Sequence, residues 1–317
     1  MPIWLQFVAV LISGLLSGFM GITLIPFLEK CKFCLPEKLD NKNNNIQIRL
    51  RPTMCGILIA FGTVVGLVIN YTLYLQFAGA DRTGTAFQTE SHVILLVLGY
   101  ALLIGFAGFG LDYLIIKKKL IYPVRKLWKF IIIFLINCAL LRVLPEQILD
   151  FGFWKWNAGI FSILIRALLL AIFWQIMQIP EQETDGMSIS LSTVQLLCLN
   201  ILLLSEKQNL YALYGFTVAG ACMGCMFWNL HPAKCKLGNT GLFFLSAVLP
   251  ILSMIYGKIY IILLYMLVYV ITILPILNKK KNFVILLKDS GYEPLQRIAL
   301  LAGFALFCGV LTVMLEA

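Results

Sequence analysis

The composition of the 317-residue chain excludes a water-soluble globule. Hydrophobic residues make up 61% of the sequence and charged residues only 13%, so too little polar surface is available to cover a soluble fold. The formal net charge of +10 therefore belongs to a protein that is surrounded largely by lipid. The composition predicts an all-α, polytopic integral membrane protein.

The apolar residues fall into runs whose length suits a membrane crossing. A hydrocarbon core of ~30 Å needs about 20 apolar residues per helical span. Ten runs are predicted to cross, at 3–28, 54–77, 92–116, 127–144, 158–179, 187–205, 209–228, 242–256, 259–277 and 295–314. The eighth run is short, which predicts a tilted, broken or partly interfacial helix. With no internal repeat and no long linker, residues 1–317 are expected to form a single polytopic membrane domain.

The basic residues predict the orientation of these spans. Most of the 25 Lys and Arg residues fall in loops that share one face if the N-terminus is outside. Loops rich in Lys and Arg stay in the cytoplasm, so the pattern predicts an N-out, C-out topology. The first run lacks a preceding basic residue and a cleavage pattern, which favours a spanning helix over a signal peptide. The same basic charge also fits attraction to anionic lipid, or a pocket for a polyanionic substrate.

The nine cysteines allow two interpretations. One is a zinc site at the cytoplasmic face, with Cys31, Cys34, Cys55 and Cys235 as ligands. The other is a set of reduced thiols in a reducing compartment. Glycines spaced four residues apart, such as Gly14 with Gly18 and Gly220 with Gly224, predict close helix packing rather than chemistry.

Polar segments at the predicted cytoplasmic face carry the chemical signal. Four stand out: RPTMCG at 51–56, GFAGFGLDYL at 105–114, ETDGMSIS at 183–190 and FWNLHPAKCKLGNTG at 227–241. Acids, lysines and glycines at helix ends suit the binding of phosphates. The predicted site is formed by cytoplasmic loops near 29–53, 110–126, 180–187, 229–241 and 278–294.

At these segments the sequence resembles the polyprenyl-phosphate sugar-1-phosphate transferases, and most closely the phospho-N-acetylmuramoyl-pentapeptide transferase type. The resemblance rests on PTM-x-G at 52–56, GF…DYL at 105–114, TDG at 184–186 and N-x-HPAK…G-x-TG at 229–241. It implies that polyprenyl phosphate attacks a uridine diphosphate sugar at the inner leaflet, releasing uridine monophosphate (UMP) in cell-wall or surface-glycan synthesis. It also implies Mg²⁺ on carboxylates and a dimer.

The sequence departs from the family pattern where the chemistry is densest. Leu111 replaces the first acid of the family's DDYL, Ser188 replaces the second acid of TDGLD, and Asn239 replaces the acid of GDTG. The family's histidine cluster aligns with Val284, Ile285 and Leu286, so no histidine stands there. An asparagine oxygen brings no charge to Mg²⁺, which prefers carboxylates.

The resemblance assigns roles to the remaining polar residues. The candidate catalytic residues and weak metal ligands are Asp112, Asp185 and Asn239, and the candidate substrate-binding residues are Thr53, Asn229, His231, Lys234 and Lys236. Simpler roles remain open. Asp185 could cap the following helix, His231 could be an ordinary loop residue, and Lys234 could only mark orientation.

Two functions fit this pattern. The first is a homologue of the lipid I-forming transferase with weak or no catalysis, acting as a partner subunit, sensor or decoy. The second is an active transferase with an altered metal site and a different sugar nucleotide. Both imply a multi-pass protein of the bacterial cytoplasmic membrane that meets polyprenyl phosphate and a uridine diphosphate sugar, as a homodimer or beside an intact transferase, without nucleic acid. A transporter fits less well, since no span carries a row of ionisable groups.

Overall fold

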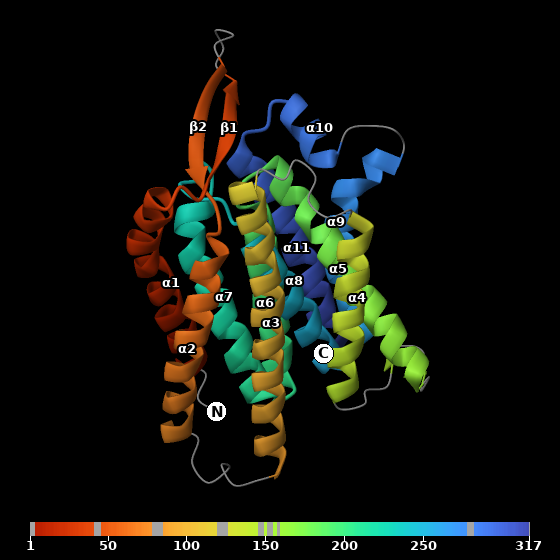
Figure 1. Cartoon of the computed structure of the whole chain (residues 1–317). Coiled ribbons are helices and arrows are strands. Elements are labelled where there is room, and N and C mark those ends of the chain that lie inside the picture. Colours follow the sequence, from red (N-terminus) through yellow and green to blue (C-terminus); the bar gives the residue numbers. More distant parts are fainter. Residues whose placement is uncertain are drawn as a thin grey trace.

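The computed structural model is a bundle of long helices with a hairpin projecting from one end (Figure 1). It describes residues 4–40, 46–77, 85–118, 126–144, 149–150, 155–156, 159–277 and 282–316. The helices are α1 (Trp4–Lys30), α2 (Gly56–Phe77), α3 (Thr85–Lys118), α4 (Lys126–Val143), α5 (Ile160–Glu183), α6 (Met187–Ser205), α7 (Asn209–Asn229), α8 (Gly238–Ile255), α9 (Ile259–Leu277), α10 (Phe283–Asp289) and α11 (Pro294–Glu316). Both termini lie on the side away from the hairpin.

The expected all-α membrane fold is confirmed. Eight helices in the described ranges are long and apolar enough to cross a membrane, so the chain is a multi-pass membrane protein. Each of the ten predicted runs corresponds to a helix. The short eighth run is extended toward its N-terminus, because α8 already begins at Gly238, inside the polar motif. Helix α10 was not predicted, since its seven residues lie in a segment expected to be a loop.

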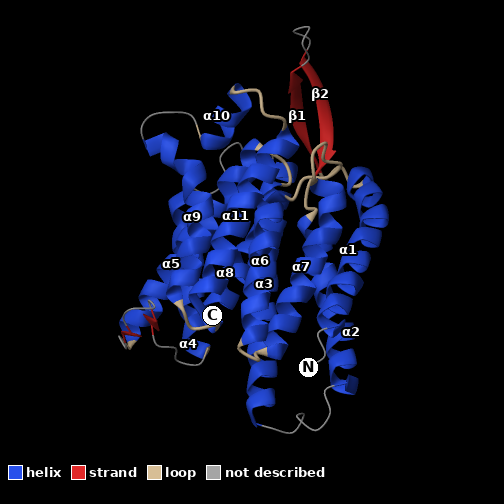
Figure 2. Ribbon diagram, turned by 180° about the vertical axis from the view of Figure 1, so that it is seen from behind, coloured by secondary structure: helices blue, strands red, loops and turns tan. Residues whose placement is uncertain are grey.

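Two antiparallel hairpins interrupt the helical pattern. Strands β1 (Cys34–Asp40) and β2 (Ile46–Pro52) pair with Cys34 opposite Pro52, and they form the projecting hairpin seen from behind in Figure 2. Strands β3 (Leu149–Asp150) and β4 (Lys155–Trp156) form a two-residue pair. The sequence analysis placed both segments in loops. Both segments contain polar residues at short intervals, so neither holds an apolar run long enough to be predicted as a transmembrane span.

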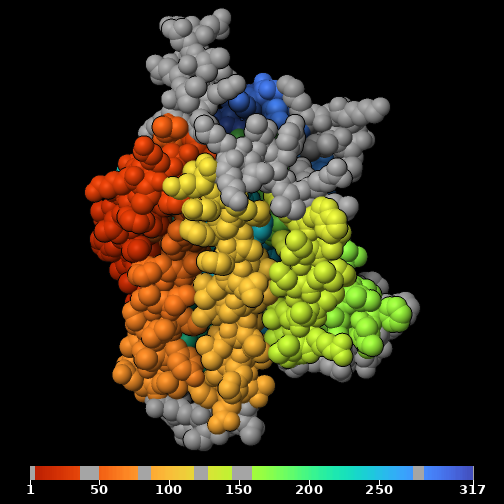
Figure 3. All heavy atoms as spheres, in the orientation of Figure 1, coloured from red at the N-terminus to blue at the C-terminus, as the bar shows by residue number. Residues whose placement is uncertain are grey.

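The centre of the bundle is built from α6, α7 and α8. At least 72% of the most apolar stretch of each of these helices is buried, against 33% for α1 and α11. Helices α1, α3 and α4 lie on the outside of the face shown in Figure 3. The peripheral helices carry large exposed side chains such as Phe7, Phe106 and Leu135, as expected for surfaces that meet lipid.

Glycines bring α1 and α7 together, as predicted. A methyl group on Gly14 would lie 3.2 Å from the carbonyl oxygen of Gly220, and one on Gly224 would overlap the carbonyl oxygen of Gly14. Trp228 then fixes the C-terminal end of α7 to α1, because its indole N–H donates to the Gly18 carbonyl at 2.9 Å. Close packing of small residues fixes α7, and α7 leads directly into the HPAK segment.

Candidate functional site

Two of the sequence motifs are joined by their backbones. The Lys236 N–H donates to the Pro52 carbonyl at 2.8 Å, and the Cys55 N–H donates to the Lys236 carbonyl at 3.0 Å. The Gly56 N–H continues the pattern onto the Leu237 carbonyl at 3.1 Å. The PTMCG segment and the segment after HPAK therefore form one rigid unit, although about 180 residues separate them in sequence.

Asp112 connects a third motif to this unit. One carboxylate oxygen, Oδ1, accepts from the backbone N–H and the side-chain Nδ2 of Asn239 at 3.1 and 2.7 Å. The other, Oδ2, accepts from the backbone N–H and the hydroxyl of Thr240 at 3.0 and 2.8 Å. These N–H groups belong to the first turn of α8, so Asp112 caps α8 from a different helix. The two oxygens together accept four hydrogen bonds while the residue is only 3% exposed.

Glycines allow α3 and α2 to approach the start of α8 this closely. A methyl group on Gly108, one turn before Asp112, would lie 2.5 Å from the Asn239 carbonyl oxygen. One on Gly56 would overlap the backbone of Gly241. Gly238 has φ of 71°, and a methyl group there would meet Asp112 Oδ2 at 2.7 Å and Thr53 Oγ1 at 2.9 Å. The motif glycines therefore serve close approach and a left-handed turn.

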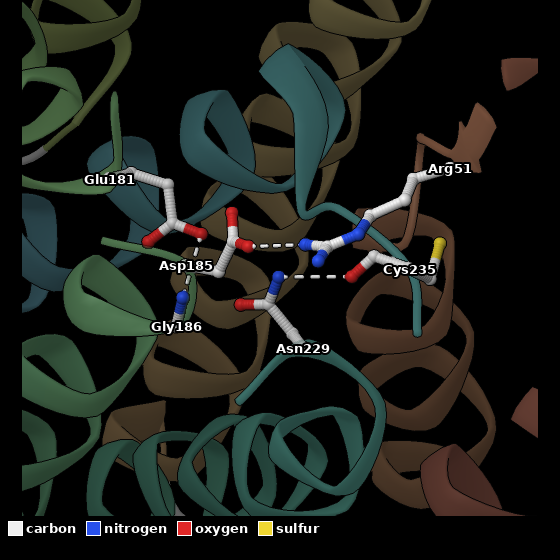
Figure 4. A network of polar contacts seen from close by, with 6 residues as sticks. All are labelled: Arg51, Glu181, Asp185, Gly186, Asn229 and Cys235. Atoms are coloured by element: carbon white, nitrogen blue, oxygen red, sulfur yellow. Dashed lines mark hydrogen bonds and ion pairs between the residues drawn. The ribbon is translucent and has the colours of Figure 1, made fainter. Parts of the chain in front are cut away.

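Asp185 forms an ion pair with Arg51. The Arg51 Nη1 lies 2.8 Å from Asp185 Oδ2, and the two side chains are 5% and 15% exposed. In Figure 4 the guanidinium of Arg51 reaches across from strand β2 toward the TDG turn. Arg51 was not among the predicted site residues, because an arginine beside a cytoplasmic motif was counted only as an orientation charge. The predicted N-cap role of Asp185 is not seen, since Gly186 is the N-cap residue of α6.

A buried acid that the sequence analysis overlooked holds the TDG turn. Glu181 accepts a hydrogen bond from the Gly186 N–H at 3.1 Å (Figure 4). It also accepts one from the Ser188 N–H at 2.9 Å. These are two unpaired donors at the start of α6, so Glu181 caps that helix. The sequence does contain a signal for this residue. Glu181 belongs to the polar run PEQETDG, which directly follows an apolar segment of membrane-spanning length, and an unpaired carboxylate so close to a span is costly.

The position of the missing acid in TDGLD is fully enclosed. Ser188 is 0% exposed, and its hydroxyl donates to the Met177 carbonyl at 2.9 Å. Thr184, on the other side of the turn, accepts from Arg297 of α11 at 3.0 Å. The TDG turn is thus fastened to α5, to β2 and to α11, and Ser188 faces the bundle interior rather than an open site.

The predicted substrate-binding residues divide into buried and exposed groups. Asn229 is 0% exposed, and its Nδ2 donates to the Cys235 carbonyl at 3.2 Å, which holds the HPAK segment in its bend. Thr53 is also buried, and its hydroxyl finds no hydrogen-bond partner in the described residues. His231 and Lys234 are exposed, with the Lys234 ammonium 5.1 Å from the centre of the Trp228 ring. Lys236 is partly buried.

Magnesium finds no fitting ligand set in this arrangement. Within the described ranges, no group of three or more His, Cys, Asp or Glu side chains is placed to hold a metal ion. The four hydrogen bonds to Asp112 use the lone pairs that a metal would need, and Asp185 already faces a guanidinium. The described acids of this arrangement therefore do not fit a Mg²⁺ ion.

The thiols are arranged differently from the zinc hypothesis. The Sγ atoms of Cys55 and Cys225 are 3.7 Å apart, and both residues are fully buried together with Cys235. The pKa of the Cys235 thiol is raised above its ordinary value by its hydrogen bond with Cys55 and by burial. Within the described residues, no group of three or more His, Cys, Asp or Glu side chains is placed to hold a metal ion, so the structure lends the zinc hypothesis no support there.

Comparison with known proteins agrees with the motif geometry. The family model for glycosyl transferase family 4 matches residues 94–257, which is just over half of the chain. The chain belongs to glycosyl transferase family 4. That matched region runs from α3 to the end of α8, and so includes Asp112, the TDG turn and the HPAK segment.

Curated relatives extend the similarity beyond this region. The phospho-N-acetylmuramoyl-pentapeptide-transferase of Pelotomaculum thermopropionicum is 27% identical over 252 residues, covering 75% of this chain and 71% of that protein. The enzyme of the same name from Prochlorococcus marinus is 26% identical over 273 residues, covering 80% and 67%. The one from the Alaska E43 strain of Clostridium botulinum is 25% identical over 284 residues, covering 86% and 82%. The predicted family resemblance is confirmed.

Proposed function

We propose that this chain is a bacterial cytoplasmic-membrane member of glycosyl transferase family 4 that keeps the ligand-facing loops of the lipid I-forming transferases and has weak or no catalysis of its own. The supporting observation is the set of partners around the surviving acids. Asp112 caps α8 with all four hydrogen bonds, and Asp185 is paired with Arg51. The family chemistry needs acids whose charge faces the substrate. Here Asp112 and Asp185 are each held by a partner within the protein instead.

Ligand binding is the part of the function that this proposal retains. His231 and Lys234 are exposed on the same segment, and Lys234 has no carboxylate partner in the described residues. An exposed lysine and an exposed histidine can contact the phosphates of a uridine diphosphate sugar or of polyprenyl phosphate. A protein that binds these molecules without transferring them could act as a sensor, a decoy or the partner subunit of an intact transferase, in a homodimer or heterodimer.

Release of UMP tests the catalytic half of the proposal. The purified chain is mixed with polyprenyl phosphate, Mg²⁺ and a panel of uridine diphosphate sugars, beside a variant carrying Leu111→Asp and Asn239→Asp. We expect no release from the wild type and measurable release from the restored variant. Release by the wild type that depends on Lys234 would instead establish an active transferase with an altered site, and the responding sugar would identify its substrate.

Thermal stability tests the binding half. Addition of a uridine diphosphate sugar should raise the melting temperature of the wild type, because a ligand that binds only the folded state stabilises it. The increase should be smaller in Lys234→Ala and in His231→Ala. The matched control is Lys258→Ala, at the opposite end of the bundle, which should keep the full increase. A wild type that no sugar nucleotide stabilises would contradict retained binding.

A further inference from the structure

A long groove lies between α1 and α7, two helices that stand side by side in Figures 1 and 2. Its volume is about 660 Å³, and we call it the α1–α7 groove. Helix α1 forms one wall, from Val10 to Ile22, and the last two turns of α7 form the other, from Met223 to Trp228. Lys234, in the segment that follows α7, also lines it. The proposed function uses Lys234 and leaves the groove itself unexplained.

The lining of the α1–α7 groove is apolar along its length. Large exposed side chains stand along it, including Leu11, Leu15 and Phe227. Glycines such as Gly14 and Gly224 add no side chain that would fill it. Helix α1 is a candidate membrane span, and exposed side chains of this kind on a span face lipid. A hydrocarbon chain is therefore the chemistry that the walls of the groove accommodate.

The length of the groove suits a chain that stays within one leaflet. Val10 and Ile22 are about twelve residues apart on α1, which is roughly 18 Å along the helix axis. Half of a hydrocarbon core of ~30 Å is about 15 Å. An acyl chain of a membrane lipid spans that distance, whereas a longer polyprenyl chain would extend beyond the groove.

A positive charge lies at the Trp228 end of the groove. No acid is among the described residues that line it, and the only acid of α1, Glu29, is seven residues beyond Ile22. The Lys234 ammonium lies 5.1 Å from the centre of the Trp228 ring, and the indole N–H of Trp228 is bonded to the Gly18 carbonyl. Contact with a ring face leaves the N–H donors of the ammonium available. Lys234 also forms no ion pair within the described ranges, so its charge is held at the groove and open to an anion.

We propose that the α1–α7 groove binds one acyl chain of an anionic membrane phospholipid whose phosphate accepts hydrogen bonds from Lys234. A zwitterionic lipid brings a cation of its own beside the ammonium, so a lipid with net negative charge is preferred. A second copy of this chain is a less favourable occupant, because a symmetric contact through the groove would place two Lys234 ammonium groups at the same level. Binding of this lipid needs no sugar nucleotide, so the inference and the proposed function can fail separately.

Lipid retention measures this directly. The full chain is assembled in nanodiscs of phosphatidylcholine with equal minor fractions of phosphatidylglycerol, phosphatidylethanolamine and polyprenyl phosphate, and is then released in mild detergent. Native mass spectrometry counts the retained lipids and the copies of the chain. We expect phosphatidylglycerol to be enriched over the other lipids, relative to the composition of the bilayer.

Two variants at exposed positions test the two ends of the bound lipid. Lys234→Ala should reduce the enrichment about fivefold, the loss of one lysine that faces an anionic headgroup. Leu15→Trp should also reduce it, because the larger side chain fills the middle of the groove. The matched controls are Lys288→Ala, at an exposed lysine of α10, and Leu135→Trp, at an exposed leucine of α4, and both should keep the full enrichment.

Four results would overturn the inference. The first is equal retention of phosphatidylglycerol and phosphatidylethanolamine by the wild type. The second is undiminished enrichment in Leu15→Trp, which would place the anion on the loop without a chain in the groove. Enrichment of polyprenyl phosphate in place of phosphatidylglycerol would assign the groove to the carrier lipid. A lipid-free dimer that Leu15→Trp converts to a monomer would assign it to a second copy of the chain.

Discussion

Asn239 donates two hydrogen bonds to a single oxygen of Asp112, from its backbone N–H at 3.1 Å and from its side-chain amide at 2.7 Å. An aspartate at position 239, as the family pattern has, could not make the second bond, and it would place two carboxylates in contact. Such a pair is stable with a cation between them or with a shared proton. The asparagine removes that need, so the start of α8 is held without an ion.

Asp112→Asn should therefore destabilise the protein rather than only affect activity. An amide cannot accept four hydrogen bonds at these two positions, so donors at the start of α8 are left buried and unpaired. We expect a loss of about 2–3 kcal/mol in the free energy of unfolding, measured by denaturant titration in mild detergent. Glu29→Gln, at an exposed acid, is the control. An Asp112→Asn variant as stable as the wild type would show that the four bonds contribute little.

Asn239→Asp should make stability depend on Mg²⁺. With EDTA present, repulsion between residues 239 and 112 should lower the melting temperature, and Mg²⁺ should restore it by bridging the two carboxylates. The wild type should show no such response. Asn282→Asp is a matched control, because Asn282 also begins a helix but accepts its bond from the Val284 N–H. Equal stabilisation of wild type and Asn239→Asp by Mg²⁺ would argue for an ion site that the wild type already has.

The Arg51–Asp185 pair should show strong coupling in a double-mutant cycle. Removing one member leaves the other charge buried, so Arg51→Gln and Asp185→Asn should each cost roughly 3–5 kcal/mol. The double variant should cost clearly less than the sum of the two, measured by unfolding of all four proteins under one condition. Additive losses would mean that the two charges are stabilised independently.

Ser188→Asp on its own should be more damaging than either of the other acid restorations. Its side chain is 0% exposed, and its own N–H already donates to Glu181. A second carboxylate there would be buried against a first without a counter-charge. We expect a lower melting temperature than for Leu111→Asp, where the side chain is partly exposed. The reverse order of melting temperatures would show that the TDG turn opens more easily than its contacts indicate.

Cys235 should resist alkylation although it lies in a polar loop. Its thiol is buried and its raised pKa keeps it protonated near neutral pH, while the thiolate is the reactive form. N-ethylmaleimide at pH 7 should label the partly exposed Cys31 and leave Cys235 unmodified until the protein is unfolded, as read by peptide mass spectrometry. Labelling of both cysteines at one rate in the folded protein would contradict the buried thiol cluster.

The sequence was sufficient to locate the membrane-spanning helices and the motifs. It was insufficient to predict which residues of the motifs contact one another. Hydrophobic length located every helix that crosses the bundle, because the bilayer imposes that length. It could not locate the β1–β2 hairpin or α10, which lie outside the apolar runs. The structure adds individual bonds between three of the motif segments, from Lys236 to Pro52 and from Asn239 to Asp112.

The roles of individual residues were harder to predict from the sequence. Glu181 and Arg51 carry structural charge at the candidate site, and the sequence analysis gave neither a role there, although Arg51 begins the RPTMCG segment. Asn229 was assigned to substrate, yet it is fully buried and binds a backbone carbonyl, because an amide within an N-x-HPAK motif looks the same in sequence whichever way it points. Its role toward substrate stays a prediction, as do those of Thr53, His231, Lys234 and Lys236.

Release of UMP by the unmodified chain tests the central claim most directly. The purified protein and the Pelotomaculum thermopropionicum relative are assayed side by side with polyprenyl phosphate, uridine diphosphate sugars and Mg²⁺. We expect the relative to release UMP with its own substrate and this chain to release none above the level without protein. Mg²⁺-dependent release by this chain, at a rate comparable with the relative, would contradict the account in which Asp112 and Asp185 are structural.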